Sequence, residues 1–265
     1  MRMNPKLLAL FVFMLIGPAT WSQTVVDSSK VIRVLSFNIL HGATTLGNFD
    51  LDAIAQVIKK VDPHLVALQE VDFKTNRAKK YDLATELGWR TKMAPLFAKA
   101  MSYDDGEYGE GVLSKYTFVG SRAVPLPHYP DSEPRVALEV TTVLPAGDTI
   151  AMIGTHLDHL KNPKDRVAQV KKINASFANN VYPTILVGDL NAVPGSVPID
   201  ILEEIWEASY DKEKPEPTFP SDNPKTKIDY VMYYPKQKWR VVDKEVICDA
   251  IASDHCAYLV TLELL

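Results

Sequence analysis

The order of apolar segments near the start of the chain constrains its fold more than any other feature of the sequence. Residues 31–39 (VIRVLSFNI) have the composition of a strand, and residues 51–60 (LDAIAQVIKK) have the spacing of an amphipathic helix that Asp50 can cap. Residues 64–69 (HLVALQ) form a second strand that is almost wholly apolar, which is typical of a strand buried on both faces. The sequence therefore predicts an α/β fold that opens with a strand–helix–strand unit.

Further strands and helices follow along the remaining chain. Helices are predicted at about 79–87, where Gly88 is expected to stop the helix, at 163–179 and at 198–208. Strands are predicted at 111–115, 136–143, 149–155, 184–189, 227–234, 239–247 and 256–264, with a hairpin turn at 145–148 and irregular loops at 102–110 and 210–225. Strands outnumber helices and no long linker divides the chain. The pattern favours two packed sheets with helices on their outer faces.

The N-terminus has the composition of an export signal. Arg2 and Lys6 precede an apolar run over residues 7–16, which is too short to span a bilayer, and Gly17-Pro18 follows it. We predict a signal peptide over residues 1–22 and a single domain over residues 23–265 that is periplasmic or secreted, without stable membrane insertion. The alternative is a retained membrane anchor, and the lack of a cysteine near the cleavage site argues against lipid attachment.

Charge and cysteine content limit the classes of partner. The formal net charge is -4, so no overall positive field draws the protein to nucleic acid or to an anionic membrane. The two cysteines, Cys248 and Cys256, could form one disulfide in an oxidising compartment or remain buried thiols. Two thiolates without CxxC spacing do not indicate a metal cluster.

Polar side chains recur at the ends of the apolar strands. Since strand ends in a layered fold can meet at one rim, we expect these residues to gather there: Asn38, Glu70, His156, Asp189, Asn191, Asp229, Asp254 and His255. Carboxylates, amides and imidazoles suit a hard divalent cation such as Mg²⁺ or Mn²⁺. Taken singly, each of them could instead be a capping residue, a turn residue or a core histidine.

Asp229 is the exception, because it lies between Ile228 and Tyr230 in an apolar strand. Burying a carboxylate there is costly unless a partner holds it. Asp229 therefore needs a cation or an imidazole beside it, and His255 is a candidate.

Six short motifs occur along the chain in this order: FNI (37–39), QE (69–70), TH (155–156), GDLN (188–191), KIDY (227–230) and SDH (253–255). In this order they resemble the endonuclease/exonuclease/phosphatase superfamily, which includes pancreatic-type deoxyribonuclease, abasic-site endonucleases, inositol-polyphosphate phosphatases and bacterial sphingomyelinases. The resemblance covers nearly the whole mature chain. It implies a four-layer α/β sandwich, with two mixed, mostly antiparallel sheets packed face to face and helices outside. It also implies metal-dependent hydrolysis of a phosphate ester by in-line attack of an activated water.

The resemblance implies a metal site for Mg²⁺ or Mn²⁺. Glu70 would be the principal ligand, and Asn38 and Asp254 would complete or support the metal shell. Asp189 and Asn191 would position or deprotonate the attacking water and bind a phosphate oxygen.

The same resemblance implies roles for both histidines. His156 would donate to the phosphate and stabilise its developing charge. His255 would act on the phosphate or as an acid or base, with its ring oriented by Asp229.

The substrate is less constrained by these motifs. Tyr108 could correspond to a substrate-binding tyrosine of the superfamily, and Arg77 and Arg135 either reach the substrate or pair with surface acids. Residues 102–111 (SYDDGEYGEG) carry four acids and no Lys or Arg, which is a poor platform for DNA.

We therefore expect a phosphoesterase acting on a small phosphorylated molecule or a lipid headgroup. A nuclease is the alternative, and a non-catalytic binding protein on the same fold is a second one. The sequence leaves the oligomeric state open.

Overall fold

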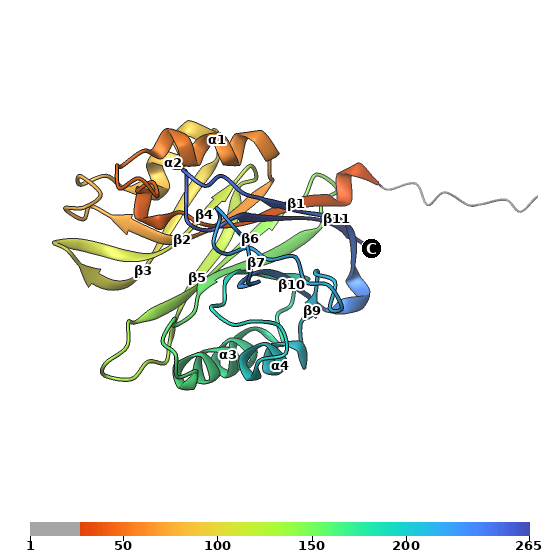
Figure 1. Ribbon diagram of the computed structural model, residues 1–265. Coiled ribbons are helices and arrows are strands. Elements are labelled where there is room, and N and C mark those ends of the chain that lie inside the picture. The colour runs from red at the N-terminus through yellow and green to blue at the C-terminus, as the bar shows by residue number, and fades with distance from the viewer. Residues whose placement is uncertain (1–26) are drawn as a thin grey trace, which may run out of the picture.

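The computed structural model describes residues 27–265 and consists of two six-stranded sheets packed face to face (Figure 1). The first sheet has the order β11-β12-β1-β2-β4-β3, and its strands are β1 (Val31–Asn38), β2 (Leu65–Phe73), β3 (Ala94–Tyr103), β4 (Gly106–Ser114), β11 (Trp239–Ile247) and β12 (Ala257–Leu264). The second sheet has the order β5-β6-β7-β8-β10-β9, and its strands are β5 (Phe118–Leu126), β6 (Arg135–Val143), β7 (Thr149–His156), β8 (Thr184–Asp189), β9 (Glu207–Ala208) and β10 (Asp229–Tyr234). The predicted signal peptide lies outside the described residues.

Helices form the two outer layers. The helices α1 (Leu51–Val61) and α2 (Leu83–Thr91) cover the first sheet, and α3 (Lys164–Phe177) and α4 (Val197–Glu203) cover the second (Figure 1). Within the sheets, β1–β2 and β7–β8 are parallel and the other neighbouring pairs are antiparallel. The predicted four-layer α/β sandwich is confirmed.

Strand β1 shows why the sheets are apolar on both faces. Its residues Ile32 and Val34 belong to the core between the two sheets, whereas Leu35 and Phe37 belong to the core beneath α1 and α2. Successive side chains of a strand point to opposite faces, so one continuous apolar run can fill both layers. A third apolar cluster fills the space between the second sheet and α3 and α4.

The first helix begins where its cap predicts. The Asp50 carboxylate accepts hydrogen bonds from the backbone N–H groups of Asp52 and Ala53, at 3.0 and 3.1 Å. These bonds satisfy donors that the first helical turn leaves free. The predicted strand–helix–strand opening is confirmed.

The second helix differs from its prediction. It begins after Asp82, whose side chain caps Thr85, and it passes through Gly88 to Thr91. A Cβ atom at Gly88 would lie 2.8 Å from the backbone oxygen of Met93. Gly88 therefore permits the segment that follows the helix to pack closely against it, and the prediction that Gly88 ends the helix is wrong.

The segment predicted as a polar loop at 102–110 is a hairpin of β3 and β4. Asp104 and Asp105 form its turn with φ angles of 45° and 59°. Two positive φ angles match the turns that join right-twisted strands, and Asp tolerates this conformation better than most residues. The Asp104-Asp105 pair was the available signal. This hairpin places Tyr108 and Glu110 in buried positions.

The structure differs from the sequence predictions in two further elements or pairs of elements, a shorter helix and two unpredicted strands. The helix predicted at 198–208 ends at Glu203, and Glu207–Ala208 form the short strand β9 instead. The strands β3 and β5 were not predicted, because both are edge strands with mixed, half-exposed composition. The predicted hairpin of β6 and β7 is confirmed.

Candidate active site

Strand ends from both sheets meet at one rim of the sandwich. In the second sheet, Asp189 of β8 lies between two partners from the neighbouring strands. Its register partner on β7 is His156, and its register partner on β10 is Asp229. In the first sheet, Asn38 ends β1. Its amide Nδ2 lies 3.3 Å from Asp189 Oδ2, which joins the two sheets through one hydrogen bond.

Close packing of β7 and β8 depends on Gly188. Its φ angle is 156°, and a Cβ atom there would lie 1.8 Å from the Thr155 carbonyl oxygen. No residue with a side chain fits between these strands without moving the backbone. The glycine therefore sets the approach of His156 to Asp189.

Glu70 leaves the regular course of β2 at a bulge. The register shifts between Leu68 and Val71, and Glu70 has a φ of 59°. A bulge re-aims a side chain that regular pleating would direct elsewhere. The carboxylate accepts a hydrogen bond from Asn38 Nδ2 at 3.1 Å and contacts His41 Nδ1 at 3.3 Å. Burial would raise the pKa of Glu70, but neighbouring groups, the His41 contact foremost and then His156 and Asn38, outweigh it and lower the pKa to about 2.

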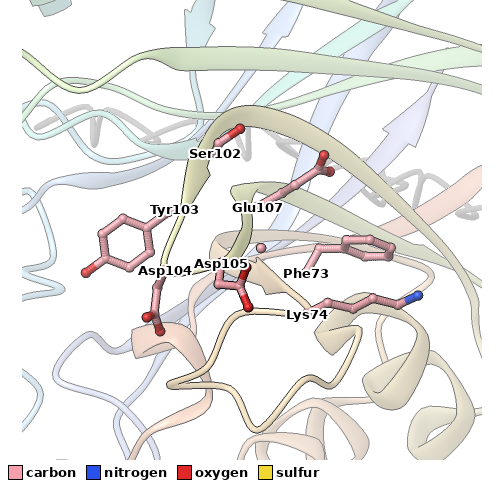
Figure 2. Close-up of a pocket in the computed structure, with 8 residues that line it drawn as sticks. Phe73, Lys74, Ser102, Tyr103, Asp104, Asp105 and Glu107 are labelled. Carbon is pink, nitrogen blue, oxygen red and sulfur yellow. The ribbon is translucent and has the colours of Figure 1, made fainter.

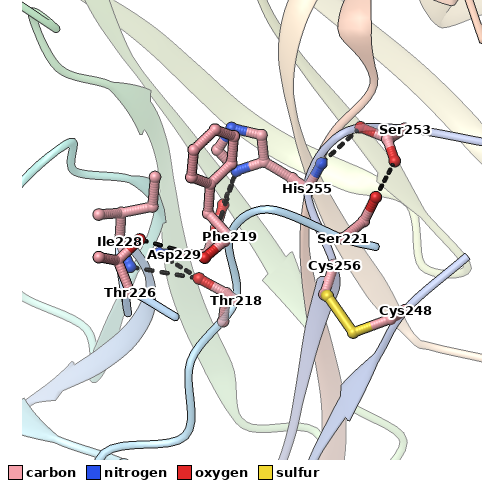
Figure 3. Close-up of a disulfide and its surroundings, with 10 residues drawn as sticks. All are labelled: Thr218, Phe219, Ser221, Thr226, Ile228, Asp229, Cys248, Ser253, His255 and Cys256. Atoms are coloured by element: carbon pink, nitrogen blue, oxygen red, sulfur yellow. Dashed lines mark hydrogen bonds and ion pairs between the residues drawn. A yellow bond between two sulfur atoms is a disulfide. The ribbon is translucent and has the colours of Figure 1, made fainter. Parts of the chain in front are cut away.

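Three contacts hold the loop that carries Asp254, and Figure 3 shows two of them, the Ser221–Ser253 hydrogen bond and the disulfide. Ser253 Oγ donates to the Asn38 carbonyl at 2.6 Å, and Ser221 Oγ donates to the Ser253 carbonyl at 2.6 Å. Cys248 and Cys256 are joined in a disulfide across the loop, which resolves the two alternatives left by the sequence. The loop is therefore fixed to the end of β1 and to the segment that precedes β10.

Asp254 itself has an oxygen without a partner. Its Oδ1 atom is buried and makes no hydrogen bond to any described residue. Burial raises the pKa of the Asp254 carboxyl. A buried carboxylate oxygen of this kind calls for a cation or an ordered water.

His255 pairs with Asp229, as the apolar surroundings of Asp229 predicted (Figure 3). The His255 Nδ1 atom lies 3.2 and 3.1 Å from the two carboxylate oxygens of Asp229, and the Phe219 ring packs 4.8 Å from the imidazole. Burial would lower the pKa of His255, but the charges of Asp229 and Asp189 and the hydrogen bond raise it to about 10. The imidazole is therefore protonated at neutral pH.

Asp189 is the centre of the cluster. Its Oδ1 accepts the backbone N–H of Asn191 at 2.9 Å, while Oδ2 lies 3.4 Å from His156 Nε2 and 3.6 Å from His255 Nε2. Burial dominates its environment and raises the pKa of Asp189 to about 7. A carboxylate near this value is suited to accept a proton at neutral pH.

The other histidine has the opposite charge state. His156 is buried, and burial together with the nearby Arg135 guanidinium holds its pKa well below the ordinary value. Asn191 Nδ2 lies 3.0 Å from His156 Nε2 and also donates to the Leu157 carbonyl. The site thus contains one neutral and one protonated imidazole.

These groups surround a cavity of about 410 Å³. Nine of the eleven residues predicted for the site line it, and these are Glu70, Arg77, Tyr108, Arg135, His156, Asp189, Asn191, Asp254 and His255. Asn38 and Asp229 lie directly behind and bond to residues of this lining. The structure therefore brings the whole predicted set together.

Sequence reasoning missed other residues of the lining, namely His41, Met101, Tyr103, Glu133, His159 and Phe219. His159 follows His156 by three residues in THLDHL, and that spacing was the available signal. The others lie in the unpredicted strand β3 or in loops, where no pattern marks them.

Arg77 and Arg135 both pair with acids and both line the cavity. Arg77 donates to the buried Asp72 carboxylate at 2.7 and 2.8 Å, and its guanidinium lies 4.5 Å from the Tyr103 ring centroid. Both arginines therefore pair with acids, one of which is buried rather than at the surface, and contact of either with a substrate stays a prediction.

A larger hollow of about 660 Å³ lies at the tip of the β3–β4 hairpin (Figure 2). Its acids already have partners, since Asp105 pairs with Lys80 and Glu107 pairs with Lys99. Buried titratable groups do not converge there among the described residues. The chemistry therefore belongs to the smaller cavity.

Two sets of donors could hold a divalent cation. Ligand atoms of Asp189, Asp229 and His255 lie within 4.8 Å of one another. His255 is protonated and hydrogen-bonded to Asp229, however, and a metal-binding imidazole must be deprotonated. Glu70 and the unpartnered oxygen of Asp254 fit a hard cation better, with the Asn38 amide orienting Glu70.

The fold and this rim define a class of four-layer α/β sandwich proteins with a carboxylate–imidazole site at the sheet ends. The model of the Endonuclease/Exonuclease/phosphatase family matches residues 35–255. The chain belongs to this family, as its motifs indicated. Among curated proteins, no match is found.

Solved structures of the family share the fold. The endonuclease/exonuclease/phosphatase from Bacteroides vulgatus has a TM-score of 0.72 and 23% identity over 89% of this chain and 99% of that one. The mannosyl-6-phosphatase of Bacteroides thetaiotaomicron has a TM-score of 0.70 and 17% identity over 87% of this chain and 99% of that one. The human Nocturnin catalytic domain with bound sulfate has a TM-score of 0.69 and 19% identity over 91% of this chain and 97% of that one. Among the described residues, no helix is long and apolar enough to cross a membrane.

Proposed function

We propose that this protein is a divalent-metal-dependent phosphoesterase that acts on a small phosphorylated molecule or a lipid headgroup. The observation that carries the proposal is the arrangement around Asp189. One cavity holds an unpartnered carboxylate oxygen, a carboxylate whose pKa is about 7, a neutral imidazole and a protonated imidazole.

Glu70 and Asp254 would hold Mg²⁺ or Mn²⁺, with Asn38 fixing the orientation of the Glu70 carboxylate. The bound cation would supply positive charge to the phosphate oxygens and offset the repulsion between these acids.

Asp189 is the base in this proposal. Asn38 and the Asn191 backbone fix both of its oxygens, so the carboxylate is oriented before a substrate arrives. Asp189 would accept the proton of a water that attacks phosphorus in line with the leaving oxygen. The Asn191 side chain would bind a phosphate oxygen beside that water.

The two imidazoles then have different tasks. The protonated ring of His255 would stabilise or protonate an oxygen of the ester, and Asp229 fixes its orientation from Nδ1. His156 would donate a neutral N–H to a phosphate oxygen. Donors that are fixed in advance stabilise developing charge without reorganising during the reaction.

Size and charge of the cavity support a small substrate. A volume of about 410 Å³ fits a phosphate with a modest leaving group, and Arg77, Tyr103 and Tyr108 form one wall. The neighbouring hairpin turn exposes Asp104 and Asp105, which would repel a polyanionic strand. The similar fold of a mannosyl-6-phosphatase is consistent with this class of substrate.

Export of the protein is part of the same proposal. The apolar N-terminal run supports it, and so does the disulfide between Cys248 and Cys256, because disulfides persist mainly in oxidising compartments.

The test is a substrate panel assayed on the purified mature protein with Mg²⁺ and with Mn²⁺. The panel contains sugar phosphates, inositol phosphates, phospholipids and plasmid DNA. We expect turnover of a small phosphate ester or a headgroup. Cleavage of DNA with no turnover of the others would favour the nuclease, and no hydrolysis at all would favour the binding protein.

A further inference from the structure

The side chain of Arg135 lies at the start of β6 and is almost fully buried, with 3% exposure. A guanidinium carries five N–H donors and no acceptor. Nη2 donates to Glu133 at 2.8 Å and approaches His159 Nδ1 at 3.4 Å. Nη1 approaches Tyr108 Oη at 3.3 Å and His156 Nδ1 at 3.0 Å. The Nη groups are therefore committed to protein partners.

The contact with His156 fixes a proton. Because the guanidinium can only donate, Nδ1 of His156 must present its lone pair to Nη1. A neutral imidazole carries its single proton on the other nitrogen, which here is Nε2. That nitrogen lies 3.4 Å from Asp189 Oδ2, which can accept its proton, on the side where the proposed substrate would bind. Asn191 Nδ2, 3.0 Å from Nε2, is also a donor and favours the opposite tautomer, so the charged guanidinium has to outweigh this neutral amide for the proton to stay on Nε2.

The buried guanidinium of Arg135 also has one donor without a partner. Its Nε atom and the Glu110 Oε2 atom are both buried without a hydrogen-bond partner among the described residues. Glu110 comes from the middle of β4 in the opposite sheet. Arg135 thus lies between the two sheets, in the wall of the cavity, and its charge pairs with Glu133.

We propose that Arg135 is a positioning residue that holds His156 as the neutral tautomer with its proton on Nε2. The inference rests on the proposed phosphoesterase function, in which His156 donates to a phosphate oxygen. Without the guanidinium, the ring can place its proton on either nitrogen. A ring with the proton on Nδ1 would present a lone pair to the phosphate and repel it.

The first experiment observes the tautomer directly. Long-range ¹H–¹⁵N correlation spectra of the metal-free protein at neutral pH distinguish a protonated from an unprotonated ring nitrogen, and His156→Gln assigns the signals. We expect pure Nε2–H in the wild type and in Arg135→Lys, because an ammonium also only donates. We expect both tautomers in Arg135→Met. Pure Nε2–H in Arg135→Met would overturn the proposal.

A further variant keeps the test open if Arg135→Met does not fold. Arg135→Gln retains polar atoms, and its amide oxygen can accept from Nδ1–H. We therefore expect the Nδ1–H tautomer to appear in Arg135→Gln, and its absence would also overturn the proposal.

The second experiment measures hydrolysis of p-nitrophenyl phosphate with Mg²⁺. We expect kcat to fall about 10²-fold in Arg135→Met with little change in KM, and Arg135→Lys to recover most of the loss. Arg122→Gln is the control, since Arg122 also pairs with a glutamate, Glu139, but bonds to no histidine within residues 27–265. A raised KM with unchanged kcat would show direct substrate binding by Arg135. The spectra need no substrate, so they decide the tautomer even if the proposed function fails.

Discussion

Glu70 has a left-handed backbone conformation in the middle of a strand, and its carboxylate has a strongly lowered pKa. The backbone conformation is costly unless the side chain serves a site, and the lowered pKa keeps the carboxylate charged at neutral pH, as a cation ligand must be. We predict that Glu70→Gln folds normally, binds Mg²⁺ much more weakly and loses activity about 10³-fold, because a ligand and its negative charge are removed. Calorimetry of Mg²⁺ binding tests this, with Glu86→Gln on α2 as the control. Unchanged affinity in folded Glu70→Gln would show that Glu70 is not a ligand.

The pair of His255 and Asp229 predicts a titration. The folded-state pKa of His255 is about 10, above its ordinary value of 6.5, because Asp229 stabilises the charged ring. The pairing therefore stabilises the fold fully below pH 6.5, and this contribution is lost as the pH rises towards 10.

We predict that Asp229→Asn lowers the His255 pKa, because the amide keeps the shape of the carboxylate and removes its charge. An NMR titration of the metal-free protein measures the shift, and the stability of the variant should depend less on pH between 6.5 and 10. An unmoved pKa would show that Asp229 does not set the charge of His255.

At the scale of elements, the loop between β11 and β12 depends on its disulfide. Cys248 and Cys256 are eight positions apart in the sequence and enclose Asp254 and His255. We predict that the double variant Cys248→Ser/Cys256→Ser loses about 2.5 kcal/mol of unfolding free energy, because the unfolded chain is no longer closed into a loop. Denaturant unfolding measures the loss, and wild type treated with reductant should match the variant. Equal stability of variant and oxidised wild type would contradict the prediction.

Elements with a strong period or a cap could be predicted from the sequence, and those that depend on tertiary contacts could not. The helix after Asp50 and the apolar strands β1, β2 and β8 were predicted because their composition alone specifies them. Gly88 misled because its role is packing against Met93, which no local pattern reveals. The edge strands β3 and β5 lack a clear alternation, since each has one neighbour and much exposed surface.

At the scale of the whole molecule, the site is assembled from segments between Asn38 and His255. Their order along the chain was visible in the motifs, but the contacts that join them were not. Two that sequence reasoning missed are Asn38 with Asp189, between the sheets, and Arg135 with His156. Only the register and the packing of the two sheets bring these residues within hydrogen-bonding distance.

The most direct test of the account is phosphate release by one protein sample taken through three states. The purified mature protein is assayed with a small phosphate ester, stripped with a chelator, and restored with Mg²⁺. We predict hydrolysis in the first state, loss of it in the second and full recovery in the third, with Asp189→Asn inactive throughout. Hydrolysis that persists after complete removal of divalent metal, or that Asp189→Asn retains, would contradict the account.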